Sequence, residues 1–107
     1  MHYENLHIAQ SEQIITVTIN RERALNALNR RTMEELTYFF TEDAPRREDY
    51  QGIILTGAGS RSFVAGADIK EFLGLDATQG EALARSGQEV FLAIERFPRP
   101  VIAVVNG

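Results

Sequence analysis

Three short stretches of the chain have the hydrophobic pattern of β-strands. Residues 14–19 (IITVTI) are rich in β-branched side chains that alternate along the chain, which is typical of a strand. Residues 52–56 (GIILT) and 101–105 (VIAVV) are short, nearly continuous apolar runs, and such runs predict buried strands.

Two longer stretches have the spacing of amphipathic helices. The first helix is expected to have Asn29 as its cap and to run to about Glu42. The second is expected to follow Thr78 and Glu81, which have capping-box spacing, and to end near Phe97, before two prolines. The apolar faces are Met33, Leu36, Phe39 and Phe40 in the first helix, and Leu83, Val90, Ile94 and Phe97 in the second.

The order of these elements is strand, helix, strand, helix, strand, and this alternation predicts an α/β layer structure. Residues 41–50 are predicted to be a charged linker in which Pro45 breaks the helix, and residues 69–75 (IKEFLGL) predict a further short helix. Three strands and two longer helices give a thin core. A complete protein of this size would therefore be marginally stable or oligomeric.

Composition excludes several classes of protein. The 107 residues carry a net charge of −4 with both signs interspersed, so nucleic acid is a poor partner. Cysteine is absent, which excludes disulfides, thiolate metal sites and cysteine nucleophiles. No apolar run approaches the length of a membrane span, and the first residues lack a signal or transit pattern. A cytoplasmic protein is expected.

The loop that follows the second predicted strand is rich in glycine and serine. Its Gly57-x-Gly59 start suggests a dinucleotide-binding loop, but Ser62 stands where the third glycine would be. A Walker lysine is also absent at the required spacing. A flexible turn after the strand is the simpler interpretation.

Serine and histidine offer little chemistry here. Ser60 and Ser62 would need a general base to act as nucleophiles, and no nucleophile-elbow motif surrounds them. His2 and His7 lie near the N-terminus and are expected at the surface. Without a carboxylate cluster they do not predict a metal site.

The stretch Ala65-Gly66-Ala67-Asp68 places small side chains at a predicted helix start. N–H groups there lack helical partners, and such a group can hold a carbonyl oxygen that becomes an oxyanion. A tight helix start without function would explain the same residues. Asp68 and Glu71 suit a first helical turn, where acids complement the helix dipole, and a general-base role would need a raised pKa.

Three blocks of sequence, in order, resemble the enoyl-CoA hydratase/isomerase (crotonase) family. They are NRERALNALN (20–29), GAGSRSFVAGADIKEF (57–72) and RPVIAVVNG (99–107). The resemblance implies a partial crotonase-like spiral of β-β-α turns, with residues 1–107 as the incomplete N-terminal part of one domain, truncated before the second half of the core. It also implies a homo-oligomer, a trimer or hexamer, and an acyl-CoA thioester substrate with no cofactor besides the coenzyme A of that substrate.

The resemblance also implies roles for individual residues. The backbone N–H of Ala67 would donate to the thioester oxygen as part of an oxyanion hole. Ala65 and Gly66 would line the adenine side, with the Ala65 carbonyl accepting from the adenine amine, and Ile69 and Lys70 would line the acyl and CoA channel. The implied CoA-binding set is Arg23, Ala24, Leu25, Ala65, Gly66, Ala67, Asp68, Ile69 and Lys70.

Arg23 has the clearest chemistry in this set, because a guanidinium suits a phosphate of CoA geometrically.

The sequence departs from the family pattern at its end. The family's second oxyanion donor, in a Gly-Gly-Gly segment, and its catalytic glutamates would follow Gly107. The 107 residues alone are therefore expected to be inactive.

The expected activity of the parent protein is enoyl-CoA hydration: syn addition of water to 2-enoyl-CoA through a thioester enolate, as in fatty acid β-oxidation. Enoyl-CoA isomerisation or another reaction of the family is an alternative. If the chain ends at Gly107, a non-catalytic CoA-binding module is a further alternative. A purely structural fragment would expose the strand at residues 101–105 and should aggregate.

Overall fold

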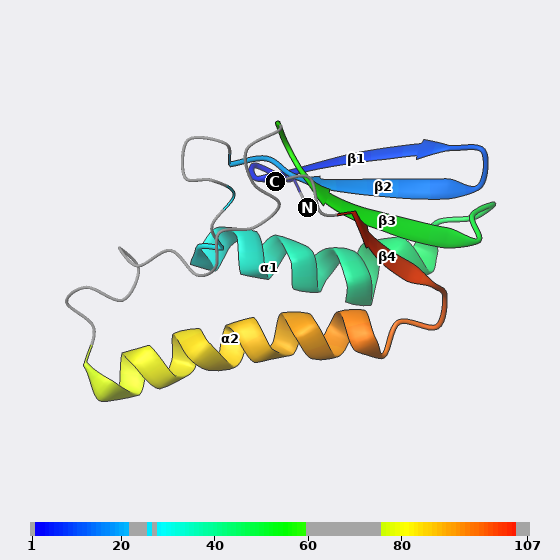
Figure 1. Cartoon of the computed structure of the whole chain (residues 1–107). Coiled ribbons are helices and arrows are strands. Elements are labelled where there is room, and N and C mark those ends of the chain that lie inside the picture. The colour runs from blue at the N-terminus through cyan, green and yellow to red at the C-terminus, as the bar shows by residue number, and fades with distance from the viewer. Residues whose placement is uncertain (1, 22–25, 27, 60–75, 105–107) are drawn as a thin grey trace.

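The computed structural model describes residues 2–21, 26, 28–59 and 76–104. They form a four-stranded sheet with two helices packed on one face (Figure 1). The α/β order predicted from the sequence is confirmed, with one strand added in front. In chain order the elements are β1 (Leu6–Ser11), β2 (Ile14–Ile19), α1 (Arg30–Tyr38), the π-helix η2 (Phe39–Asp43), the 3-10 helix η3 (Ala44–Arg46), β3 (Gly52–Gly57), α2 (Ala77–Glu95) and β4 (Val101–Val104).

The strands lie in the order β1-β2-β3-β4, which is also their order in the sequence. β1 and β2 form an antiparallel hairpin, whereas β2, β3 and β4 are parallel. Parallel neighbours need long crossovers, and here α1 and α2 supply them. Ile15, Val17 and Ile19 on one face of β2 are buried against the helices, as their alternation predicts.

β1 was not predicted, and two features explain why. Its segment, LHIAQS, is half polar, and only Leu6 is fully buried because the strand lies at the edge of the sheet. The hairpin turn also lacks the usual glycine or asparagine signal. Glu12 and Gln13 occupy it with φ of 51° and 70°, left-handed values that these residues rarely adopt.

Helix α1 begins as the sequence predicts. The Oδ1 of Asn29 accepts a hydrogen bond from the Thr32 backbone N–H at 2.9 Å and from the Thr32 hydroxyl at 2.6 Å. The predicted apolar face, Met33, Leu36, Phe39 and Phe40, is buried throughout.

The linker predicted at residues 41–50 is wrong over its first half. The chain stays helical through η2 and η3, because Phe40 and Ala44 are buried and hold these turns against the core. Pro45 stands in the first turn of η3, where its missing N–H needs no partner, so it does not break the helix.

Helix α2 has a capping box, but not at the predicted pair Thr78 and Glu81. The pair is Asp76 and Gln79, two residues earlier with the same spacing. The Asp76 carboxylate accepts from the Gln79 N–H at 2.8 Å, and the Gln79 amide oxygen accepts from the Asp76 N–H at 3.2 Å.

The predicted apolar face of α2 lies toward the core. Leu83 and Val90 are buried, and Ile94 is half-buried against the same cluster. Phe97 lies just beyond the helix, and its ring meets that of Phe40 edge-on, with centroids 5.5 Å apart.

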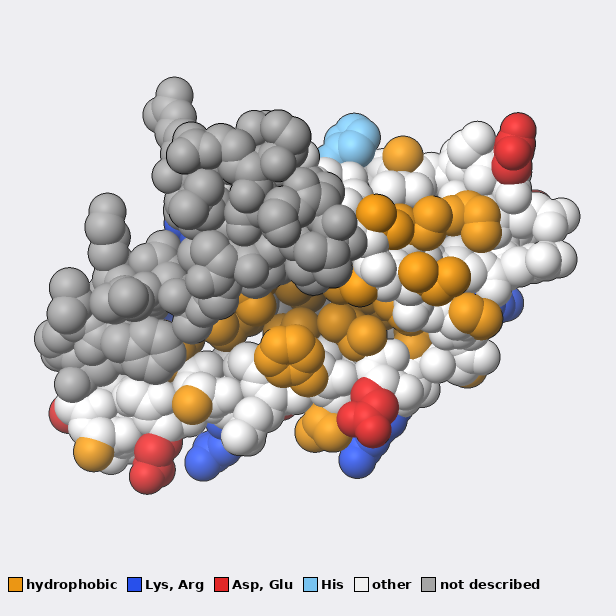
Figure 2. Space-filling view, viewed as in Figure 1, with side chains coloured by type: hydrophobic (Ala, Val, Ile, Leu, Met, Phe, Trp, Pro, Cys, Tyr) orange, Lys and Arg blue, Asp and Glu red, His pale blue; other side chains and the backbone are white. Residues whose placement is uncertain are grey.

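Strand β4 was expected to be buried, and this prediction is wrong for the described chain. Ile102 is 60 % exposed and Val104 is 45 % exposed, because β4 pairs only with β3 and forms the other edge of the sheet. Phe91 and Leu92 on α2 are also exposed. Figure 2 shows hydrophobic side chains gathered on the face that Figure 1 displays.

A buried carboxylate fixes the segment that leads into β1. Glu35 on α1 is 0 % exposed and accepts from the backbone N–H groups of Glu4 at 3.1 Å and Asn5 at 2.9 Å. The guanidinium of Arg31 donates to the same carboxylate at 2.6 Å. These three donors satisfy a charge that would otherwise be costly to bury.

A second polar cluster, formed by Tyr3, Asp43 and Arg47, ties the N-terminal segment to η2. The Tyr3 hydroxyl and the Arg47 guanidinium both donate to the Asp43 carboxylate, the latter at 2.9 Å. Partial burial raises the pKa of Asp43, but these two hydrogen bonds outweigh it, and the pKa lies below its usual value. Burial and the bond to Asp43 raise the pKa of Tyr3, which therefore stays protonated.

Acid is expected to destabilise the fold through Asp43. Because its pKa is lower in the folded chain than the ordinary value of about 3.9, its contribution to stability is complete above that value and is lost as the pH falls through the folded-state pKa. In urea denaturation, the midpoint of Asp43→Asn should therefore fall less steeply than that of the wild type between about pH 5 and pH 2.

The matched control for this experiment is Glu42→Gln, which removes the exposed ion pair with Arg46 at 3.3 Å. Exposed pairs contribute little, so this variant should keep the wild-type pH dependence. Equal slopes for Asp43→Asn and the wild type would contradict the role of Asp43.

Candidate functional site

The residues that the family resemblance assigns to CoA binding fall outside the described part of the chain. This holds for Arg23, Ala24 and Leu25 in the first segment and for Ala65 to Lys70 in the second. Ser60, Ser62 and Glu71 also lie outside the described residues. The structure does describe the framework on either side of both segments, and this framework fixes where each of them leaves the sheet.

Both segments leave from the carboxyl ends of neighbouring parallel strands. β2 ends at Ile19, which is in register with Gly57 at the end of β3. The Ala58 N–H donates to the Ile19 carbonyl at 2.8 Å, so the pairing continues one residue past the strand. Ligands of open α/β sheets bind at the carboxyl edge of the strands, which makes this edge the candidate site.

Asn26 is a polar residue that connects the chain after β2 to the end of β3. It is 1 % exposed and has φ of 58°, in the left-handed region. Its backbone N–H donates to the Arg21 carbonyl at 2.8 Å, and its Oδ1 accepts from the Arg21 N–H at 2.8 Å. Its Nδ2 donates to the carbonyl of Ala58 at 3.1 Å, across to the end of β3.

The sequence does not predict a role for Asn26, because the surrounding residues 24–28 (ALNAL) form a small, apolar stretch. The available signal was the asparagine itself. A polar residue inside ALNAL must either face solvent or have buried partners, and asparagine tolerates left-handed backbone better than most residues.

Gly59 is the last described residue before the second segment. Its φ of 76° lies in the left-handed region that favours glycine, so the chain turns sharply after β3. The turn predicted after the strand is therefore present at Gly59. The remainder of the suggested dinucleotide loop, from Ser60 onward, lies beyond the described residues.

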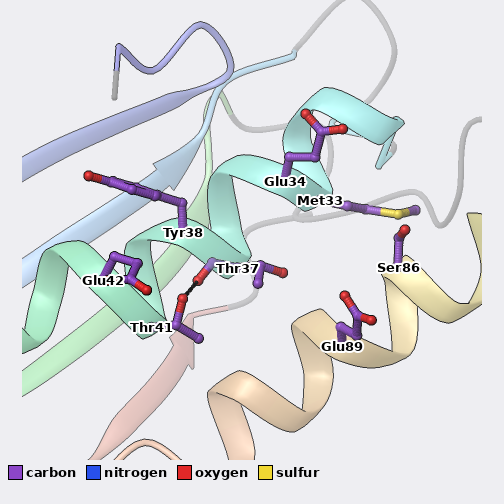
Figure 3. A pocket seen from close by; sticks show the side chains of 8 residues that line it. All are labelled: Met33, Glu34, Thr37, Tyr38, Thr41, Glu42, Ser86 and Glu89. Atoms are coloured by element: carbon purple, nitrogen blue, oxygen red, sulfur yellow. Dashed lines mark hydrogen bonds between the residues drawn. The ribbon is translucent and has the colours of Figure 1, made fainter.

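A groove lies between α1 and α2, but it does not suit an anionic ligand. It measures about 300 Å³, and Figure 3 shows its side chains. Three carboxylates line it, those of Glu34, Glu42 and Glu89, and none of its lining residues is basic. A CoA phosphate would be repelled there.

A second groove, of about 430 Å³, lies near the end of α2. Its walls are largely apolar, with Phe40, Leu92 and Phe97 among them, and they include both Arg96 and Glu89. The first groove is lined by helical residues, and the second also includes residues that follow α2. Neither includes a residue from the carboxyl ends of β2 and β3.

The remaining candidates for chemistry are consistent with surface roles. His2 and His7 are exposed, as predicted. Within the described residues, no group of three or more histidine, aspartate or glutamate side chains could hold a metal ion. In the same part of the chain, neither helix combines the length and the apolar character of a membrane span.

Comparison with known proteins agrees with this geometry. The family model described as Enoyl-CoA hydratase/isomerase matches residues 9–107. The chain is 41% identical over 107 residues to a short-chain-enoyl-CoA hydratase of Clostridium acetobutylicum, and 42% identical over 109 residues to a crotonyl-CoA hydratase of Syntrophomonas wolfei. Each alignment covers 100% of this chain and 41% of the relative.

A solved structure supports the same conclusion for the fold. The enoyl-CoA hydratase of Bacillus anthracis superposes with a TM-score of 0.91 at 32% identity, over 97% of this chain and 40% of that one. The chain therefore belongs to the enoyl-CoA hydratase/isomerase family, and the predicted crotonase-like fold is confirmed. It spans about two fifths of the length of the relatives that it matches.

Proposed function

We propose that the protein containing this chain is an enoyl-CoA hydratase that adds water to short 2-enoyl-CoA thioesters. The observation that carries the proposal is the pairing of the ends of β2 and β3, which are followed in the sequence by the two CoA-binding segments and which Asn26 connects through its bond to Ala58. The similarity to proteins named short-chain-enoyl-CoA and crotonyl-CoA hydratase supports this substrate class.

In the proposed reaction, the water oxygen bonds to the β-carbon and a proton reaches the α-carbon, giving 3-hydroxyacyl-CoA. Between these events, negative charge moves onto the thioester oxygen. The Ala67 backbone N–H would donate to that oxygen, and small neighbours such as Ala65 and Gly66 would let the thioester approach the main chain. No cofactor is needed besides the coenzyme A of the substrate.

The remaining residues of the set would hold the rest of the CoA molecule. Arg23 would pair with a phosphate, and Ala24 and Leu25 would line the wall beside it. From the second segment, Asp68, Ile69 and Lys70 would border the acyl and CoA channel. The family resemblance assigns the second N–H donor and the acid–base carboxylates to residues outside this sequence.

The proposal is tested with the product of the complete reading frame and crotonyl-CoA. Loss of the enoyl-thioester absorbance and appearance of 3-hydroxybutyryl-CoA are expected, with kcat in the ordinary enzymatic range of about 1–1,000 s⁻¹. Absence of turnover with every short 2-enoyl-CoA would overturn it. Binding of crotonyl-CoA in calorimetry without turnover would indicate a non-catalytic CoA-binding protein instead.

Isomerisation is a second candidate function. The chain is 32% identical over 118 residues to the human mitochondrial Delta(3,5)-Delta(2,4)-dienoyl-CoA isomerase. Moving a double bond and adding water both place charge on the thioester oxygen, so the same N–H donor would serve both reactions. Conversion of a 3-enoyl-CoA faster than hydration of crotonyl-CoA would favour the isomerase.

We further propose that the protein is a cytoplasmic homo-oligomer, a trimer or hexamer, as the family resemblance implies. The exposed apolar residues Phe91 and Leu92 on α2 are compatible with additional packing on that helix. Sedimentation equilibrium of the complete protein would give the assembly directly, and a monomer at micromolar concentration would contradict it.

A further inference from the structure

The two grooves beside α1 and α2 are parts of one longer groove between these helices, which lie side by side and run in the same direction (Figure 1). Ser86 lines the middle hollow, of about 300 Å³, and also a further hollow of about 340 Å³ near the starts of both helices. Thr37, Thr41 and Glu89 line both the middle hollow and the one of about 430 Å³ near the end of α2. These shared residues define a continuous interhelical groove along most of both helices.

Each wall of the interhelical groove is formed by one helical row of side chains, with spacings of three and four residues. The row on α2 is Gln79, Ala82, Ser86, Glu89, Ala93 and Arg96. The row on α1, continued into η2, is Arg30, Glu34, Thr37 and Thr41. Rows with this spacing are the ridges between which the side chains of another helix pack. The short alanine, serine and threonine side chains in the middle of both rows let a third helix approach closely.

The floor of the interhelical groove is apolar. Met33 of α1 packs against α2 at Gly87, where an added Cβ would lie 3.8 Å from the Met33 methyl group. Phe40, Leu92 and Phe97 line the hollow near the end of α2. Leu92 is 42 % exposed, so an apolar side chain that enters the groove would remove apolar surface from water. The floor therefore suits the apolar face of an amphipathic helix.

The middle of the interhelical groove is acidic on both walls. Figure 3 shows Glu34 of α1, Glu42 of η2 and Glu89 of α2 around the same hollow. Glu42 pairs with Arg46 at 3.3 Å, whereas the exposed carboxylates of Glu34 and Glu89 form no ion pair or hydrogen bond within the described residues. Cationic side chains on an incoming helix would therefore meet two carboxylates that have no such partner, one on each wall.

We propose that the interhelical groove is the docking site of a basic amphipathic helix supplied by another protein. The incoming helix places its apolar row on the floor and Lys or Arg side chains against Glu34 and Glu89. A second copy in a two-fold arrangement fits less well, because two facing grooves leave both empty and bring their acidic middles together. The rare π-helical turn of η2, which borders the groove, supports the inference, since such turns recur at functional sites. This interaction is independent of the proposed enzymatic function.

The test measures binding of a fluorescently labelled peptide to the product of the complete reading frame by fluorescence anisotropy. The peptide is a synthetic helix with leucine at spacings of three and four residues and lysine at the positions between them. The groove variant combines Glu34→Lys with Glu89→Lys, both at exposed positions. Its Kd should be about tenfold or more above that of the wild type, because two attractive charges become repulsive. The same peptide with glutamate in place of lysine should not bind.

Two matched controls separate the groove from the rest of α2. Glu81→Lys combined with Glu95→Lys makes the same change of charge at exposed positions that line none of the three hollows, and its Kd should stay within about threefold of the wild type. For the apolar floor, Leu92→Ser should raise Kd about fivefold. Phe91→Ser should leave Kd unchanged, because Phe91 is 65 % exposed but is not among the residues that line the hollows.

Three results would overturn the docking site. Equal losses of affinity in the two charge-reversal variants would mean that the peptide follows overall charge and not the groove. Absence of binding to the wild type would mean that the remainder of the complete protein covers the groove. A change of assembly mass in the groove variant without peptide, measured by sedimentation equilibrium, would make the groove an interface between copies. Circular dichroism melting identifies any variant that fails to fold, and either the charge pair or the Leu92 and Phe91 pair decides the result alone.

Discussion

Replacing Ala67 by proline is expected to lower kcat for crotonyl-CoA hydration by about 100- to 1,000-fold in the complete protein. Proline has no backbone N–H, so the proposed donor to the thioester oxygen disappears. That donor matters most when the oxygen carries negative charge, and loss of one such donor lowers kcat by this factor in studied enzymes. Steady-state kinetics with crotonyl-CoA measure the effect.

Ala67→Gly is the matched control, because it keeps the N–H and removes only a methyl group. Its kcat should stay close to that of the wild type. Calorimetry with butyryl-CoA, which lacks the reactive double bond, should detect binding to Ala67→Pro, because CoA contacts other than this N–H remain. Wild-type kcat in Ala67→Pro would exclude Ala67 as an oxyanion donor.

Replacing Phe39 by alanine is expected to destabilise the 107-residue chain by about 3–5 kcal/mol. The ring is 0 % exposed and stands edge-on to Tyr3, at 6.4 Å between centroids, and to Phe40, at 5.2 Å. The Arg47 guanidinium lies over the same ring, 5.9 Å from its centroid. Truncation leaves a cavity where α1, η2 and the N-terminal segment meet, and the urea midpoint should fall accordingly.

Phe91→Ala is the matched control, because it makes the same substitution at an exposed position. Phe91 is 65 % exposed on α2, so its truncation in the same chain creates no cavity and should change stability by no more than about 0.5 kcal/mol. Equal losses for the two variants would mean that Phe39 is not the centre of the core. Small domains have only about 5–15 kcal/mol in total, so Phe39→Ala should remove a large fraction of the free energy of unfolding.

The sequence predicted those elements whose hydrophobic pattern is decided locally. Strands β2 and β3 and the faces of both helices follow from periods of two and 3.6, because burial on one side imposes them. β1 escaped prediction because an edge strand needs few apolar residues. The exposure of β4 was expected only under the structural-fragment alternative, because the apolar content of a strand does not tell which elements will cover it.

The capping error on α2 has a similar origin. Two pairs have capping-box spacing, Asp76 with Gln79 and Thr78 with Glu81. They begin two residues apart, and either pair could begin the helix. The choice depends on where the preceding segment arrives. At the candidate site, the two CoA-binding segments were predicted from motif resemblance. The bond from Asn26 to Ala58 joins residues 32 positions apart, and the local hydrophobic pattern cannot predict such a tertiary contact.

The parallel arrangement of β2, β3 and β4 has a kinetic consequence. Each pairing can form only after a crossover helix has returned the chain, and the bond from Thr56 to the Val104 carbonyl spans 48 residues. Closing loops of this length is slow, and topologies dominated by distant contacts fold orders of magnitude more slowly than local ones. During synthesis, β3 must therefore wait, unpaired on one side, until α2 and β4 have left the ribosome. In that interval its hydrogen-bonding edge is open to strands of other chains, and the rate of translation through residues 58–104 becomes a determinant of the yield of folded protein.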